Sequence, residues 1–212
     1  MIKFNVTKNG KKLSKELYMW DESTKTFSSN ENNLVLDFSN ISGVTFNTGD
    51  YCTFKTGYGC TFDTENNCTF KTEENCCFDT GSHCTLKTGS DCTFNTGSGC
   101  TFDTEHDCCF NTGSNCTFKT GSDCTFKTKY NCTFNTRSDC YFNTGYNCSF
   151  NTGSSCTFDT GDDCCFTTEK KCVVVRRDVF EVYELKEGIK YVLNEYRIPG
   201  LKNKEEIFEE LL

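Results

Sequence analysis

Hydrophobic and polar residues alternate with a period of eight along most of this chain. From Cys52 to Cys172 a cysteine returns at every eighth position, and the octad reads C-T-F-x-T-G-x-x. Phe holds the third position in fourteen of the sixteen octads, all but those of Leu86 and Val174, and Thr holds the fifth from Thr56 to Thr168. Successive side chains of a strand point to opposite faces, so positions one, three and five share a face. The pattern predicts one short strand per octad, with Cys, Phe and Thr facing inward.

The last three positions of each octad are polar and are expected to form a corner. Ten of the sixteen corners that precede a cysteine begin with Gly, which reaches left-handed backbone conformations at no steric cost. We therefore expect this glycine to supply the turn. Asn or Asp stands before many of the cysteines and is expected to form Asx-turns. Six corners begin with a charged residue instead: Glu65, Glu73, Glu105, Lys129, Arg137 and Glu169.

A strict repeat of strand and corner predicts an all-β fold, a parallel β-solenoid in which identical side chains form ladders along the axis. An eight-residue coil has a perimeter of roughly 26 Å, which leaves little room for Phe, whereas sixteen residues give two strands and two corners. The alternation of Lys55, Asp63, Lys71, Asp79 and Lys87 at position four favours one octad per coil, the alternative. Exposed charge pairs are worth less than about 1 kcal/mol, so we predict two octads per coil, with the three lysines stacked.

The chain divides into three predicted regions: residues 1–35 form an N-terminal cap of β-hairpins, residues 36–179 the octapeptide-repeat solenoid, and residues 180–212 a C-terminal cap. In the first region, Asn9-Gly10 predicts one hairpin turn and the polar run 21–24 predicts a second. Tyr18, Trp20 and Phe27 are expected to plug the open end of the repeat core with aromatic side chains.

The repeat is predicted to begin before its cysteines do. Val44 and Leu36 occupy the cysteine position of two earlier octads, so this column needs an apolar group and not a thiol. In the C-terminal region, 180–185 alternates like a strand and 189–193 is expected to return beside it as a hairpin. Asn203 and Glu206 resemble a capping box that opens a short amphipathic helix. Its apolar residues need a surface, either the last turn or a second subunit: Ile207, Leu211 and Leu212.

Composition narrows the partners and the compartment. The formal net charge of −8 disfavours nucleic acid and anionic membranes as partners, and the sequence contains no apolar run long enough to span a bilayer. Residues 1–6 alternate like a strand and do not resemble a signal peptide. We therefore expect a cytoplasmic, reducing location and nineteen free thiols that act as small hydrophobic groups. Disulfides between stacked cysteines are the alternative.

The sequence predicts no catalytic, cofactor-binding or metal-binding residues, and no enzyme activity. A column of inward thiols does not converge on a tetrahedral metal site, and His83 and His106 are far apart. A catalytic cysteine needs an activating base and access to solvent, which buried equivalent cysteines lack. The doubled cysteines differ, since Cys77, Cys109 and Cys165 occupy the outward second position and are expected to be exposed and oxidisable.

The octad resembles those of uncharacterised C-T-F-x-T-G repeat proteins of large DNA viruses and phages, and this resemblance covers most of the chain. The expected architecture is similar to the RTX-type β-rolls and, more loosely, to pentapeptide-repeat solenoids. The Gly and Asp signature with which RTX repeats bind calcium is absent from this sequence, so calcium is not expected.

These patterns together predict a structural protein, a rigid spacer or scaffold that acts by shape and interaction. The resemblance implies a viral structural component packaged in a virion. An unknown protein partner, or self-association through the C-terminal cap, is expected. The alternative function is surface recognition by the repeated face, either ice binding by its outward threonines or mimicry of duplex DNA.

Overall fold

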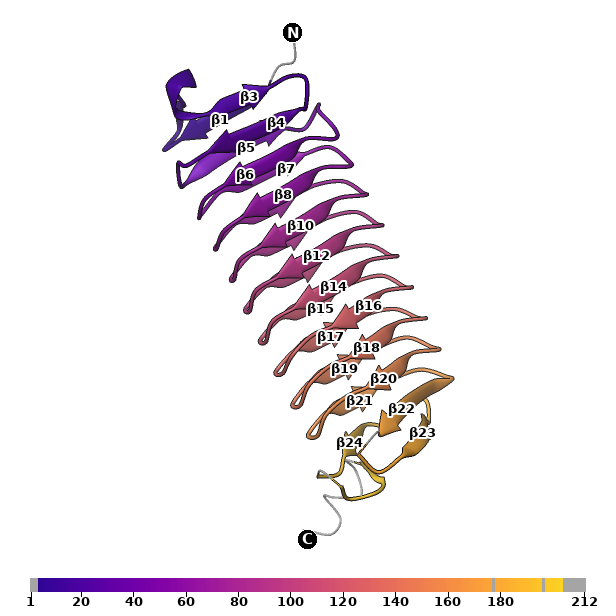
Figure 1. Cartoon of the computed structure of the whole chain (residues 1–212). Coiled ribbons are helices and arrows are strands. Elements are labelled where there is room, and N and C mark those ends of the chain that lie inside the picture. Colours follow the sequence, from indigo (N-terminus) through magenta and orange to yellow (C-terminus); the bar gives the residue numbers. More distant parts are fainter. Residues whose placement is uncertain (1–3, 177, 196, 204–212) are drawn as a thin grey trace. The chain divides into compact units, whose positions relative to one another are not determined.

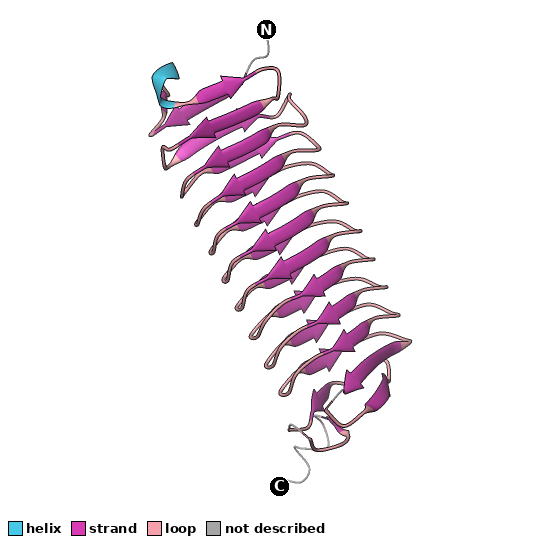
Figure 2. Cartoon of the chain, viewed as in Figure 1, coloured by secondary structure: helices cyan, strands magenta, loops and turns pink. Residues whose placement is uncertain are grey.

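The computed structural model of the chain describes residues 4–176, 178–195 and 197–203, and shows an all-β parallel β-solenoid. It contains two compact units, Met1–Cys109 and Phe110–Leu212. Strands dominate the described residues of both units, and the one helical element among them is the 3-10 helix η1 (Lys15–Leu17; Figure 2).

The N-terminal unit contains strands of two sheets, which alternate along the chain (Figure 1). The first sheet runs in the order β2 (Lys11–Lys12), β1 (Asn5–Lys8), β5 (Leu34–Phe38), β7 (Thr53–Thr56), β9 (Thr69–Lys71), β11 (Thr85–Lys87) and β13 (Thr101–Asp103). The second runs in the order β3 (Met19–Asp21), β4 (Thr26–Ser29), β6 (Thr45–Thr48), β8 (Thr61–Thr64), β10 (Cys77–Thr80) and β12 (Thr93–Thr96). Strand β14 (Cys109–Thr112) contains the boundary between the two units.

The C-terminal unit repeats this arrangement. Its strands of the first sheet are β15 (Thr117–Lys119), β17 (Thr133–Asn135), β19 (Ser149–Asn151), β21 (Cys165–Thr167), β24 (Tyr191–Leu193) and β25 (Leu201–Asn203). Its strands of the second sheet are β16 (Thr125–Lys127), β18 (Tyr141–Asn143), β20 (Thr157–Asp159), β22 (Cys172–Arg176) and β23 (Glu181–Leu185).

The strand registers give the length of one turn. Thr53 pairs with Thr69 in the first sheet and Thr61 with Cys77 in the second, both in parallel. The partners stand sixteen positions apart, so each turn consists of two octads and the octads alternate between the sheets. It is the turn length predicted from the space that the Phe side chains need inside the coil.

The inward and outward faces are those that the alternation predicts. The cysteines of the first position and the phenylalanines of the third are at most 3% exposed, and most threonines of the fifth position are buried. Phe rings of the same sheet stack face to face, and rings of opposite sheets meet edge to face. For example, Phe54 and Phe70 are stacked at 4.9 Å, whereas Phe54 and Phe62 are T-shaped at 5.3 Å. Both arrangements suit the ring quadrupole.

The corners correct the role predicted for their first glycine. The left-handed residue is the third of the corner, directly before the cysteine, as at Asn67 and Asp91 with φ near +58°. Asn and Asp tolerate this conformation better than most residues. Glycine at the first corner position instead allows the backbones of successive turns to approach closely. A Cβ on Gly97 would lie 2.9 Å from the backbone nitrogen of Ser82, which belongs to the preceding turn.

The second corner residue ties successive turns together. The side-chain oxygen of Asp50 accepts a hydrogen bond from the backbone N–H of Asn66 at 2.8 Å, and Asn66 does the same for Ser82 at 2.8 Å. Ser82 then accepts from the backbone N–H of Ser98 at 3.1 Å. Polar corners therefore satisfy backbone donors that the strands leave unpaired.

The N-terminal end is closed by the two hairpins that the sequence predicts. Strand β1 pairs antiparallel with β2 and β5, and β3 pairs antiparallel with β4. An aromatic cluster fills the space inside, where the ring of Phe4 stacks on that of Phe38 at 4.3 Å and lies 5.1 Å from that of Trp20. Tyr18 stacks on Phe27 at 5.3 Å. The predicted aromatic plug is present.

The position predicted for Leu36 is wrong by two residues. Leu36 pairs with Phe54 and so lies in the phenylalanine column, while Leu34 is fully buried in the cysteine column. The corner at 39–43 has five residues instead of three, and Ile41 within it is buried, which a uniform octad pattern could not reveal.

The predicted C-terminal hairpin is also wrong. Strand β23 pairs antiparallel with β22, whereas β24 pairs with β21 and β25, so the two segments cover different sheets. Each sheet ends in a row of free N–H and C=O groups, and one reversed strand can cover only one such edge. Asn203 lies in β25, and the helix predicted to follow it falls on 204–212, outside the described residues.

A buried ion pair closes this end. Arg176 replaces the fifth-position threonine and is 2% exposed. Its Nε and Nη2 donate to the two carboxylate oxygens of Asp178 at 2.9 and 2.6 Å, and its Nη1 donates to the Asn194 carbonyl at 3.2 Å. The hydrogen bonds from Arg176 hold the pKa of Asp178 far below its ordinary value of 3.8. The backbone N–H of Arg197 also donates to Asp178, at 2.8 Å.

Replacing Phe118 by Ala should destabilise the protein far more than replacing its outward neighbour Thr117 by Ala. Phe118 is fully buried and stacks on Phe134 at 4.8 Å, so its loss should cost about 3–5 kcal/mol, against roughly 0.5 kcal/mol for Thr117. Chemical denaturation followed by circular dichroism measures both. Equal midpoints would mean that the strand faces are inverted.

Replacing Asp178 by Asn should destabilise the C-terminal unit at neutral pH, by about 3 kcal/mol, because Arg176 would remain buried without its counter-charge. A depressed pKa stabilises the fold above the pKa of the unfolded chain, about pH 4, and this contribution disappears as the pH falls through the folded value. The wild type should therefore lose its advantage over the variant below about pH 4. Denaturation of both proteins between pH 7 and 2 measures this, with the exposed Asp139→Asn as control; a constant difference would contradict it.

Candidate functional site

The three doubled cysteines lie on the outward faces, as predicted. Cys77 and Cys109 are exposed on β10 and β14, and Cys165 is half-buried on β21. All nineteen cysteines carry free thiols, so the stacked cysteines form no disulfides among themselves. The structure therefore separates two populations of thiol by strand position alone.

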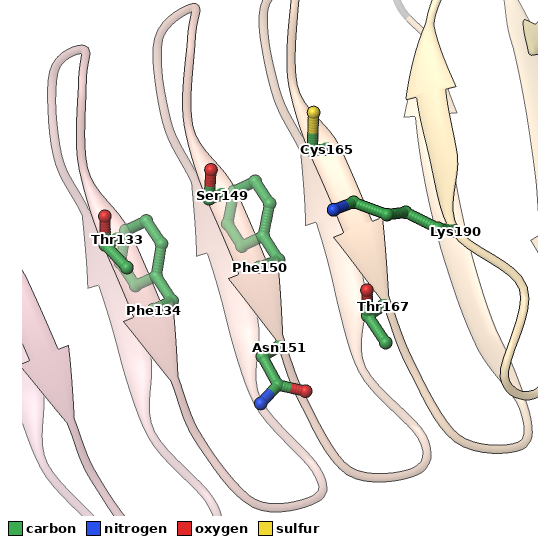
Figure 3. Close-up of a pocket in the computed structure, with 8 residues that line it drawn as sticks. All are labelled: Thr133, Phe134, Ser149, Phe150, Asn151, Cys165, Thr167 and Lys190. Atoms are coloured by element: carbon green, nitrogen blue, oxygen red, sulfur yellow. The ribbon is translucent and has the colours of Figure 1, made fainter. Parts of the chain in front are cut away.

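A cavity of about 290 Å³ lies beside Cys165. The cavity occupies the outward face of the first sheet in the C-terminal unit and extends over three strands (Figure 3). Its lining consists of Thr133, Phe134, Ser149, Phe150, Asn151, Cys165, Thr167 and Lys190. It is a shallow, open site, and hydroxyl, amide and thiol groups provide most of its chemistry.

The overhanging Lys190 is the feature that the sequence did not predict. Strand β24 pairs with β21 so that Tyr191 lies opposite Phe166, which places Lys190 beside Thr167 on the outward face. Figure 3 shows its side chain reaching back across the sheet toward Cys165. The alternation of 189–193 could have placed Lys190 outward, but not on this sheet, because the hairpin was predicted with the wrong partner.

A second cavity, of about 370 Å³, opens at the neighbouring corner. Arg137 and Glu169 contribute opposite charges to it, and Gly153 stands between them in the same corner position. The rest of its lining is neutral and polar: Ser122, Asn135, Thr136, Ser138, Asn151 and Thr152. Asn151 lines both cavities, so the two adjoin on the surface of the C-terminal unit.

The chemistry that these groups offer is binding by hydrogen bonds and charge. The eight residues that line the cavity beside Cys165 include no His, Asp or Glu that could take a proton from its thiol. Among the described residues, no three metal-ligating side chains converge. His83 and His106 lie at different corners, and a hydrogen bond with Asp107 raises the pKa of His106.

The inward thiols are covered, and the thiol of Cys148 is also hard to ionise. Cys148 is 1% exposed and donates to the carbonyl oxygens of Tyr146 and Lys129 at 3.6 and 3.9 Å. The thiol of Cys132 lowers the pKa of Cys148, but the thiol of Cys164 and burial raise it, with a net value of about 11. Since the thiolate is the reactive form, burial and protonation act together against its modification.

In the dilute native protein, Cys77 and Cys109 should react with a thiol reagent within minutes, and Cys165 more slowly. The first-position cysteines should react only on unfolding, because the solvent does not reach them. Mass spectrometry of peptides after timed alkylation measures each site. Fast and uniform labelling of all nineteen cysteines would show that the turns open readily.

Comparison with known proteins gives this chain no relative. No family model, no curated protein and no solved structure matches it. No helix among the described residues is long and apolar enough to cross a membrane. The structure itself establishes a β-solenoid with an eight-residue sequence period and ladders of Cys and Phe.

Proposed function

We propose that this chain is a structural protein, a rigid β-solenoid that serves as a spacer or scaffold and offers repeated faces to its partners. The observation that carries the proposal is the equivalence of successive turns within each unit. The same side chains are buried at the same positions, and the same polar columns face outward, turn after turn. A surface of this kind suits extended contact better than the binding of one small molecule.

Rigidity follows from the hydrogen bonding. Strands hydrogen-bond to the strands of the turns before and after them. Backbone groups of the corners also pair between turns; for example, the Tyr51 N–H donates to the Asn66 carbonyl at 3.0 Å. Such solenoids gain their stability from contacts between neighbouring turns, so a long stack resists bending. A reducing compartment is part of the proposal, since free thiols fill the core. The resemblance of the octad to repeats of large DNA viruses and phages supports a virion as the assembly.

Deleting a whole turn should leave such a function largely intact, wherever the deletion lies. The two variants lack residues 61–76, in the N-terminal unit, or 125–140, in the C-terminal unit, and each keeps the sixteen-residue register. Both should fold, and both should be recovered with the native assembly as efficiently as the wild type. Quantitative mass spectrometry of the tagged protein, purified from its own host with its assembly, measures the recovery.

A role that depends on a single site would give a different result. In that case one deletion would abolish recovery while the other would not, although circular dichroism showed both variants folded. Loss of recovery in only one folded variant, or recovery of the wild type as a free monomer, would overturn the scaffold proposal.

Recognition of a repeated surface is the second candidate, and a column of threonines favours it. Thr53, Thr69, Thr85 and Thr101 lie in register on the outward face of the first sheet. Three of these threonines have a lysine at the fourth position of the same strand, and the charged lysines interrupt the threonine surface and bind water there. An ice-recrystallisation assay tests this candidate: inhibition by the wild type that Thr69→Tyr removes would support it, and no inhibition would exclude it. DNA mimicry has less support, since these lysines would repel a DNA-binding partner.

A further inference from the structure

The two outward faces of the N-terminal unit carry opposite charges at the same strand position. Lys55, Lys71 and Lys87 occupy the fourth position on β7, β9 and β11 of the first sheet, and we name this surface the lysine face. Asp63 and Asp79 occupy that position on β8 and β10 of the second sheet, and this surface is the aspartate face. All five side chains point outward and are exposed.

The lysine face holds three like charges in a row. Lys71 pairs in register with Lys55 on one side and with Lys87 on the other, so the lysines repeat at the spacing of the turns, about 4.8 Å. Lys87 forms an ion pair with Asp103 at 3.4 Å. Lys55 and Lys71 form no ion pair with any residue that the structure describes. Asp37 on β5 and Asp103 on β13 are the register partners of Lys55 and Lys87, so carboxylates flank the row at both ends. Like charges directly opposite each other destabilise a sheet, so repulsion remains at Lys71, which has a lysine on both sides.

The aspartate face is the complementary case. Asp63 and Asp79 are register partners on adjacent strands, and the fourth position of the neighbouring strands β6 and β12 holds Asn47 and Asn95. Asp79 accepts a hydrogen bond from the side-chain amide of Asn95 at 3.0 Å. Asp63 forms no ion pair with the described residues. No lysine interrupts this column between β6 and β12.

The spacing of the two faces is matched because one coil generates both. Asp63 follows Lys55 by one octad, which is half a turn, and Lys71 follows Asp63 by the same step. The two aspartates therefore lie at heights between those of the three lysines. Both faces are parallel sheets with Thr as the usual neighbour at the second position, for example Thr69 and Thr61, so neither has a bulky side chain there that would hold a partner away.

We propose that the lysine face of one copy docks on the aspartate face of a second copy, so that solenoids associate side by side. The contact joins unlike faces, and each copy keeps one face free, so association continues into open lateral arrays and does not stop at a dimer. This inference rests on the scaffold function and names its partner as another copy of the chain. It differs from association through the C-terminal cap, which involves neither face.

The net charge of −8 opposes this association and sets the conditions for observing it. At about 0.15 M salt the screening length is about 8 Å, which weakens repulsion between whole molecules but preserves contacts between adjacent side chains. At 1 M salt the screening length falls to about 3 Å and the contacts weaken as well. Association should therefore be strongest at intermediate ionic strength and should fall at least tenfold at 1 M.

The experiment reverses the charge of one face at a time in the full chain. One variant carries Lys55→Glu and Lys71→Glu, which makes both faces acidic, and the other carries Asp63→Lys and Asp79→Lys, which makes both faces basic. Sedimentation velocity in a reducing buffer at about 0.15 M salt measures association, against a monomer mass of 24.0 kDa. The wild type should associate, and each variant alone should remain monomeric.

An equimolar mixture of the two variants should associate again, because every contact then joins an acidic face to a basic one. Attraction between net charges cannot explain this, since each double substitution changes the formal −8 by four charges and both variants stay negative. Two variants with the same changes in charge away from these faces serve as controls and should associate like the wild type. They are Lys127→Glu with Lys129→Glu, in the C-terminal unit, and Glu73→Lys with Glu74→Lys, at a corner of the N-terminal unit.

Labelling of Cys77 gives a second measurement. Its thiol lies on the aspartate face, two residues before Asp79, so alkylation of Cys77 should slow as the protein concentration rises, and alkylation of Cys165 should not. A wild type that stays monomeric at about 0.15 M salt, or a mixture that fails to associate, would overturn the proposal. So would association that survives both face variants but is lost on Val182→Glu at the exposed C-terminal cap. If the wild type still enters its native assembly in that case, the scaffold function stands without lateral docking.

Discussion

Stacking of identical side chains between successive turns is the interaction on which this structure depends. A parallel register of sixteen residues places Phe on Phe and Cys on Cys, and a shift of one residue would turn both columns toward the solvent. The phenylalanines are the largest fully buried side chains, and the smaller cysteines are buried beside them at the start of each octad. The fold thus obtains a dry core from a chain in which only 35% of the residues are hydrophobic.

The corners follow from the same constraint. A Cβ at the first corner position would crowd the backbone of the preceding turn, and glycine at ten of the sixteen corners avoids this crowding. Asn and Asp at the third position accept the left-handed backbone that returns the chain to the next strand. Polar side chains at the second position accept hydrogen bonds from the backbone of the following turn. The corners therefore hold successive turns together as well as reversing the chain.

The ends of a solenoid need a different solution from its middle, because the last strand of each sheet has no successor. Reversed strands cover these edges at both ends of the chain, with an aromatic cluster at the N-terminal end and the Arg176–Asp178 pair at the C-terminal end. The outward faces have no such requirement and are free to vary. At the fourth position of the N-terminal unit, three stacked lysines lie on the first sheet and two stacked aspartates on the second, whereas the C-terminal unit mixes lysine, aspartate and neutral amides there, as at Lys127, Asp159 and Asn135.

The sequence alone determined the repeat unit, the inward face, the outward position of Cys77 and its two counterparts, and both N-terminal hairpins. These features depend on local alternation and on turn residues, which any single octad or hairpin displays. The tertiary structure decided what depends on contacts between distant segments. The five-residue corner before Val44 moved Leu36 to the phenylalanine column, and the edge that each C-terminal strand covers placed Lys190 in the same cavity lining as Cys165. The opposite charges of the two faces follow from the turn of two octads that the sequence predicts, and the register confirms them: Lys55 and Asp63 alternate along the chain and lie on different sheets.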